Sequence, residues 1–318
     1  MVSNTKNLSD DTSKAISQPL VAWLILIGLV LTWGSSFILI KRGLEHFSAT
    51  EVGAVRVVIT FLFLMPFALR RLSKLKRKDF LWLGLAGLVG NFFPAFLFAA
   101  AQQGIDSSTA GLLNSLTPLF TLIVGLVIFK IKAGKMQVIG VFVGLLGALG
   151  LVSSSGGNTF SFNITYALMV VLATIFYAIN VNLIKAKLNH IKSITITSVT
   201  FFIVGFPASI ILFGTTDFVH KLTNEPGAWA GLGYLAILAV VGTGVAMMGF
   251  NVLIKKTTPI FASSVTYLIP VVALLWGIID GEYFDPSFFL WIGLIIGGVL
   301  LVNKTGAKPR RIRRKRMV

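Results

Sequence analysis

The chain has 318 residues, of which 55% are hydrophobic and 12% charged, and its net charge is +17. A soluble domain needs more polar surface than this composition supplies. The absence of cysteine excludes disulfide frameworks, thiolate catalysis and cysteine-based metal sites. A nucleic-acid partner is not expected either, because the basic residues lie in short segments beside apolar runs and not on one soluble face.

Apolar stretches of about 20 residues recur along the chain, and one such helix spans the roughly 30 Å of a bilayer core. Continuous apolar runs without polar alternation exclude a membrane β-barrel. The expected fold class is therefore an all-α membrane protein with ten transmembrane helices. The first 20 residues form a polar tail without the basic segment of a signal peptide, so the first span is expected to be retained. The expected spans are 21–40, 50–69, 80–103, 107–129, 135–153, 161–184, 193–213, 228–254, 258–279 and 286–303.

The basic residues alternate from loop to loop. Of the 28 Lys and Arg residues, 24 lie in the two tails and the even-numbered loops, three lie in the odd-numbered loops, and Arg56 lies inside the second span. Loops rich in Lys and Arg stay in the cytoplasm. This pattern predicts that both termini are cytoplasmic, in a multi-pass protein of a bacterial inner membrane.

The second half of the chain repeats the first. Ala110 and Pro118 of the fourth span recur as Ala262 and Pro270 of the ninth, at a common offset of 152 residues. The next spans carry Gly-xxx-Gly pairs, 140/144 and 293/297, at an offset of 153. We expect these glycines to permit close helix contact within the chain. The repeats should cover 21–153 and 161–303, with a cytoplasmic tail at 1–20 and a basic cytoplasmic tail at 304–318.

A repeat of five spans has a geometric consequence, because the second copy must start on the opposite side of the membrane. The two halves are then inverted, and many secondary transporters bind their solute between such halves near the midplane. The alternative is duplication of a structural bundle without transport. Transport is favoured because inverted halves supply two equivalent end states for alternating access.

The chain resembles the EamA-type branch of the drug/metabolite transporter superfamily over about residues 21–303. The first span ends in Trp33-Gly-Ser-Ser-Phe37-xxx-Lys41, Arg56 occupies the position of an early family arginine, and the repeated Ala-x7-Pro segments match family helices. A family Gly-Glu pair is matched by Gly281-Glu282, whereas Phe129-Lys130 departs from it in the first half. The resemblance implies two inverted five-helix repeats, cytoplasmic termini, and export or exchange of amino acids and related metabolites.

Polar and aromatic side chains interrupt the middle of several expected spans. An unpaired amide or hydroxyl costs about 2–7 kcal/mol in hydrocarbon, so these groups should face a partner or a wet cavity. Interhelical hydrogen bonds, worth about 0.6 kcal/mol each, are the alternative role for any one of them. As a set, we expect them to bind a solute. The expected substrate-binding residues are Trp33, Ser36, Asn91, Phe92, Asn114, Thr117, Tyr177, Asn180, Thr243, Asn251, Tyr267 and Trp276.

Two prolines and one arginine complete the candidate site. Pro118 and Pro270 each remove a helical hydrogen bond and are expected to act as hinges. The role of Arg56 is open: it binds a solute carboxylate, or it has a structural role, in which it either snorkels outward or caps the carbonyls of a neighbouring helix. Trp276 lies near a span end, so an interfacial position is its alternative.

The sequence carries no recognised catalytic motif. All three histidines lie in loops, and no Asp or Glu lies at mid-membrane, so a midplane proton relay is not expected. Metalloprotease, nucleotide-binding and hydrolase motifs are absent, and we expect no enzyme activity, no cofactor and no metal.

The expected function is export or exchange of a small, amino-acid-like metabolite. A passive channel and a non-transporting membrane scaffold are the alternatives. The expected partners are the solute and membrane lipids, including anionic headgroups at the basic tail. A monomer is the default expectation.

Overall fold

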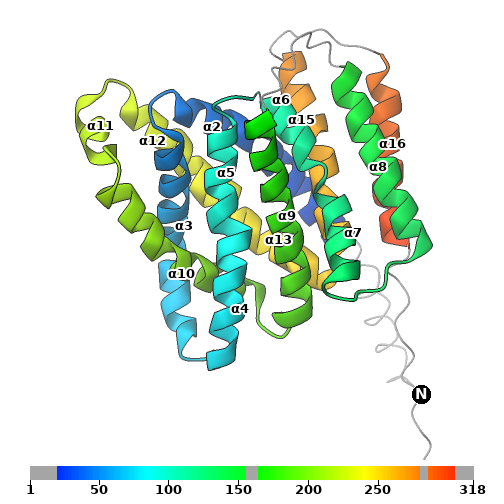
Figure 1. Ribbon diagram of the computed structural model, residues 1–318, viewed down its shortest axis with the longest axis horizontal. Coiled ribbons are helices and arrows are strands. Elements are labelled where there is room, and N and C mark those ends of the chain that lie inside the picture. The colour runs from blue at the N-terminus through cyan, green and yellow to red at the C-terminus, as the bar shows by residue number, and fades with distance from the viewer. Residues whose placement is uncertain (1–19, 106, 155–163, 280–285, 305–318) are drawn as a thin grey trace, which may run out of the picture.

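The computed structural model describes residues 20–105, 107–154, 164–279 and 286–304, without the side chains of 107–109, 112, 151–154, 273–279, 288, 303 and 304. The described chain is helical and forms one bundle (Figure 1). Six helices are long and apolar enough to cross a membrane: Leu20–Leu44, Ala49–Leu72, Arg77–Ala101, Ile164–Lys187, Ser193–Gly214 and Ala228–Lys256. Together with many exposed apolar side chains on the bundle's outside, they show a membrane protein.

The first half begins with the span that ends in α2 (Ser36–Leu44) and continues with α3 (Ala49–Leu72). The third span joins α4 (Arg77–Gly87), the π-helical η1 (Leu88–Phe92) and α5 (Phe93–Ala101). The fourth expected span is broken into α6 (Ser107–Asn114) and α7 (Thr117–Val127), and α8 (Lys135–Ser154) follows.

The second half repeats this plan. It runs through α9 (Ile164–Lys187) and α10 (Ser193–Gly214), and adds a short α11 (Phe218–Asn224). The eighth span joins α12 (Ala228–Ile237), a second π-helix, η2 (Leu238–Val245), and α13 (Ala246–Lys256). A second broken helix, α14 (Pro259–Ser263) and α15 (Val265–Ile279), precedes α16 (Phe288–Lys304).

All ten expected ranges are therefore helical over most of their described length. The fourth, fifth, ninth and tenth contain shorter apolar helices than the six above, at Thr117–Val127, Lys135–Gly150, Pro259–Val272 and Phe289–Val302. That all ten cross the membrane stays a prediction.

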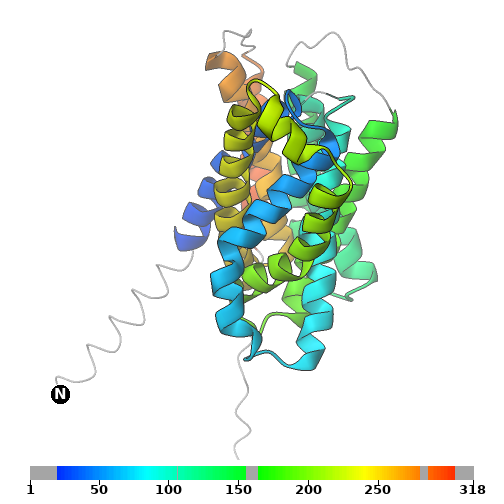
Figure 2. The same cartoon turned by 90° about the vertical axis from the view of Figure 1, so that its left-hand side faces the viewer.

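Corresponding helices of the two halves run in opposite directions. Asp79, in the first turn of α4 and so near the end of α3, lies 3.1 Å from Nε2 of His190, just before α10, although α3 and α10 occupy equivalent places in the two halves. The end of α3 thus lies beside the beginning of α10 (Figures 1 and 2). This antiparallel placement of equivalent helices is the arrangement expected of inverted repeats.

Glycines bring α8 and α16 together. A Cβ on Gly298 would lie 2.5 Å from the backbone nitrogen of Gly144, and one on Gly140 would lie 2.7 Å from the carbonyl oxygen of Gly298. The expected role of the first Gly-xxx-Gly pair in close packing is confirmed. For the second pair the expectation is wrong, because Gly293 and Gly297 have nothing within 4 Å of such a Cβ and Gly298 makes the contact.

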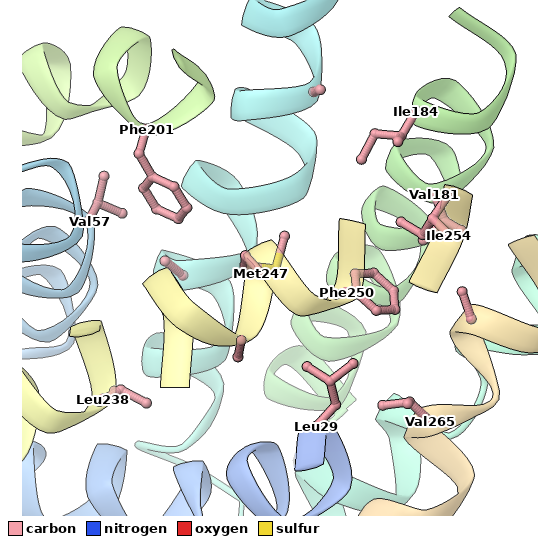
Figure 3. Packing of buried hydrophobic residues seen from close by; sticks show 14 of the residues in the cluster. Leu29, Val57, Val181, Ile184, Phe201, Leu238, Met247, Phe250, Ile254 and Val265 are labelled. Carbon is pink, nitrogen blue, oxygen red and sulfur yellow. The ribbon is translucent and has the colours of Figure 1, made fainter. Parts of the chain in front are cut away.

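The core lies where the two halves meet. Figure 3 shows α13 of the second half in its centre, with Met247 between Phe201 of α10 and Val181 of α9, and with Leu29 and Val57 of the first half beside these helices. Phe201 is fully buried. Apolar packing here surrounds the polar cavity described next.

Candidate functional site

A central cavity lies between the two halves and receives side chains from both. Its lining comes from the first span, α3, the third span, the two broken helices, α9, η2 and α13. Both π-helices contribute to it: Asn91 from η1 and Thr243 from η2. Such irregular turns are frequent at functional sites because they reorient side chains within a helix. The lining residues are Trp33, Ser36, Phe37, Ile40, Arg56, Gly90, Asn91, Phe98, Asn114, Thr117, Tyr177, Asn180, Val181, Thr243, Met247, Phe250, Ser263, Thr266 and Ile269.

Most of these residues form pairs related by the internal repeat. Three pairs are 144 residues apart: Trp33 with Tyr177, Ser36 with Asn180, and Phe37 with Val181. Four pairs are 152 residues apart: Asn91 with Thr243, Phe98 with Phe250, Asn114 with Thr266, and Thr117 with Ile269. The offset grows because the connection between α10 and α12, which contains α11, is longer than that between α3 and α4. The cavity is therefore nearly two-fold symmetric.

Two aromatic walls follow the same symmetry. Trp33 packs edge-on against Phe250, with ring centroids 5.0 Å apart. Their counterparts, Tyr177 and Phe98, stack with centroids 5.9 Å apart. The Trp33 indole also donates a hydrogen bond to the Gly242 carbonyl of η2 at 2.9 Å, which fixes this wall to the second half. Each wall thus contains one ring from each repeat.

The polar contacts across the cavity are paired as well, with one difference. Arg56 of α3 donates from Nε to Oγ1 of Thr243 at 2.8 Å. The contact that the repeat relates to it joins Asn91, the counterpart of Thr243, to Thr200 of α10. There Asn91 Nδ2 donates to Thr200 Oγ1 at a longer distance, 3.5 Å. Thr200 stands 144 residues after Arg56, so one repeat has an arginine where the other has a threonine. Arg56 is the only charged residue in the described lining.

The geometry of Arg56 places its side chain against η2 of the second half, and which of its open roles it has stays a prediction. Nε is held by Thr243, and the Thr243 hydroxyl donates in turn to the Leu238 carbonyl at 2.9 Å. Thr60, one turn further along α3, donates to the carbonyls of Arg56 and Ala239. Guanidinium contacts with carbonyls of a neighbouring helix, which capping requires, do not occur among the described residues.

Asn180 carries a buried amide whose oxygen, Oδ1, has no hydrogen-bond partner in the described part of the chain. Gly90 makes room for it, because a Cβ there would lie 2.2 Å from Asn180 Nδ2. Its counterpart Ser36 faces Gly242 in the same way, at 3.0 Å from such a Cβ. An unsatisfied buried amide costs about 1–3 kcal/mol, so a cavity ligand or water is needed to satisfy it.

Eight of the twelve expected binding residues line this cavity: Trp33, Ser36, Asn91, Asn114, Thr117, Tyr177, Asn180 and Thr243. Whether they bind a solute stays a prediction. Trp276 belongs to α15, but its side chain lies outside the described part of the chain.

The other three expected residues, Phe92, Asn251 and Tyr267, point elsewhere. The Tyr267 hydroxyl donates to the Val141 carbonyl of α8 at 2.7 Å, and Asn251 donates to Thr197 of α10 at 2.8 Å. Phe92 packs against Phe96, with ring centroids 4.9 Å apart. All three share one physical reason. Each directly follows a lining residue, and consecutive helical side chains point about 100° apart.

The prolines occupy different positions in the two broken helices. Pro118 lies in the first turn of α7, where its missing N–H costs no helical hydrogen bond, and the break precedes it at residues 115–116. Pro270 lies inside α15, after a break at Ser264. The two broken helices touch: the Ser115 hydroxyl donates to the Thr266 carbonyl at 3.3 Å. Their role as hinges stays a prediction.

Known proteins are similar to this chain in sequence, and a solved structure is similar to it in fold. The "Uncharacterized inner membrane transporter YedA" of Escherichia coli K12 is 29% identical over 286 residues, which cover 87% of this chain and 89% of that protein. A "Probable amino-acid metabolite efflux pump" of Salmonella typhimurium is 25% identical and covers 90% and 95% of the two chains. A solved crystal structure shares the fold at a TM-score of 0.67 and 16% identity, covering 90% of this chain and 97% of its own.

The model of the EamA-like transporter family matches the chain twice, at residues 20–153 and 164–304. These two matches follow the two inverted halves around the cavity. Together they cover most of the chain, which belongs to the EamA-like transporter family.

Proposed function

We propose that this transporter is a secondary carrier, which exports or exchanges a small, amino-acid-like metabolite by alternating access. The observation that supports it most is the paired lining of the central cavity, in which equivalent residues of two inverted halves surround one space. Exchanging the conformations of such halves moves the opening from one side to the other without a second site. The names of relatives such as the amino-acid metabolite efflux pump support the solute class.

We further propose an orientation in a bacterial inner membrane with both termini in the cytoplasm. The basic loops meet at one end of the bundle: Lys185 donates to the carbonyls of Ile254, Lys255 and Thr257, and Asp79 lies beside His190. This end would face the cytoplasm by the distribution of Lys and Arg. The basic tail would then contact anionic headgroups of the inner leaflet. We propose a monomer that needs no cofactor.

A flux measurement tests the carrier mechanism. Purified protein in liposomes should take up labelled amino acids or related solutes with saturation, and the same unlabelled solute inside should accelerate uptake. A passive channel would give uptake that the inner solute does not accelerate. Failure of every solute in a broad panel to show saturable flux would contradict the proposal.

A matched pair of variants separates transport from a scaffold role. Asn114 lines the cavity and Asn251 does not, although both are buried amides. Asn114→Ala should change the KM for transport, whereas Asn251→Ala should affect stability and leave KM unchanged. A scaffold predicts that neither variant changes any flux.

A further inference from the structure

The guanidinium of Arg56 is only partly used by the protein. Its Nε donates to Thr243, but neither Nη group makes a hydrogen bond or ion pair with any described residue. A guanidinium has five N–H donors in a rigid fork, so four of them remain for a ligand in the cavity. The fork matches the two oxygens of a carboxylate.

The positive charge of Arg56 has no negative partner in the described lining. The three described ion pairs use Glu45, Glu51 and Asp79, and all three lie away from the cavity. Glu51, the nearest of these in sequence, is buried and already bound by Lys221 at 2.8 Å and by the Ser48 hydroxyl. A charge inside a membrane bundle is costly without a partner and typically marks a solute pathway.

The remainder of the cavity suits an apolar body. The Trp33–Phe250 wall and the Tyr177–Phe98 wall present four aromatic rings. Flat or branched apolar groups pack well against such rings. Apart from Arg56, the polar side chains of the described lining are neutral, and the amide oxygen of Asn180, which has no partner among the described residues, is an acceptor for one donor of the ligand.

We infer that the cavity binds a small monocarboxylate with an apolar body, and that the Nη groups of Arg56 hold its carboxylate. The amino group of an amino acid is accepted but not required, because no described carboxylate in the lining recognises its charge. This inference rests on the proposed transport function and adds the chemical class of its solute.

The first test uses the unaltered protein. Binding of L-phenylalanine, 3-phenylpropionate and L-phenylalaninamide to the purified transporter is measured by thermal shift and by competition against uptake in liposomes. The two carboxylates should bind at least about tenfold more tightly than the amide, since a guanidinium donates stronger hydrogen bonds to a charged carboxylate than to a neutral amide. Equal or tighter binding of the amide would overturn the inference.

The second test assigns the preference to Arg56. Arg56→Gln should abolish the difference between acid and amide, and Arg56→Lys should keep part of it because the charge remains without the fork. Arg70→Gln is the matched control, an exposed arginine at the far end of the same helix, and should keep the preference. If Arg56→Gln folds and keeps the full preference, another group recognises the carboxylate and the inference is wrong.

The outcomes separate this inference from the proposed function. Saturable flux of some solute, combined with no preference for carboxylates, would leave the transport function standing and reject the role of Arg56. Selective carboxylate binding without any flux would support the binding site and reject the carrier.

Discussion

Arg56 and Thr243 belong to different repeats, yet Arg56 Nε donates a hydrogen bond of 2.8 Å to Thr243 Oγ1 at the central cavity. Thr243 itself sits in the π-helix η2 and is fixed by its bond to Leu238. The orientation of the only charge in the described lining therefore depends on the contact between the two halves.

Removal of the Thr243 hydroxyl should loosen this arrangement. Thr243→Val keeps the shape of the side chain and should raise the KM for a transported carboxylate on the order of tenfold, with a smaller change in kcat, because Arg56 loses its positioning partner. Transport kinetics in liposomes measure both constants. Thr243→Ser restores the hydroxyl and should recover most of the loss. A fall in protein stability with unchanged KM would instead indicate a purely structural threonine.

Close packing of α8 against α16 should depend on Gly298 and not on its neighbour. Gly298→Ala places a methyl group against the backbone of Gly144, and overpacking of this kind costs about 1–3 kcal/mol. Gly297→Ala meets nothing within 4 Å and should be neutral or slightly stabilising, because alanine favours helix by up to about 1 kcal/mol. Thermal unfolding in detergent distinguishes them, and similar melting temperatures for the two variants would contradict the described packing.

Lys185 should stabilise the basic end of the bundle. Its ammonium group donates to the carbonyls of Ile254, Lys255 and Thr257 at 2.7–3.1 Å, where α13 ends. Lys185→Met removes these bonds, leaves partly buried carbonyls without a donor, and should cost about 1–3 kcal/mol. Lys256→Met is the control, since Lys256 is exposed at the same helix end. A lower melting temperature for Lys185→Met alone is the expected result.

The orientation of the chain can be tested independently of transport. Reporter fusions at residue 75 and at the C-terminus should both report the cytoplasm, and a fusion near residue 157 should report the outside, because loops rich in Lys and Arg remain inside. Any other pattern would contradict the proposed topology.

Much of the fold could be predicted from the sequence, because the hydropathy pattern and the internal repeat each extend over many residues. The offset of 152 between Pro118 and Pro270 is the offset that relates four pairs of cavity residues. Phe98 and Phe250 are one of these pairs, but hydropathy does not single them out, because phenylalanine is ordinary in apolar helices.

Which individual side chains point into the cavity could not be predicted in the same way. Asn91 lines the cavity and Phe92 does not, and a hydropathy pattern without a polar face cannot decide between two consecutive residues. The π-helices add to this difficulty, because each shifts the helical register by a fraction of a turn. The breaks before Pro118 and Pro270 likewise depend on tertiary packing.

The near symmetry of the cavity is broken at Arg56 and Thr200, and this difference would give the proposed binding site two distinct ends. Two identical five-helix chains would have built a pocket with two arginines facing one another, or with none, and a solute could then have entered it in either of two equivalent poses. Joining the halves in one polypeptide lets their sequences diverge, so that a single arginine remains. Under the proposed carboxylate binding, a solute held by that arginine would keep one orientation throughout its passage, whichever side of the membrane it came from.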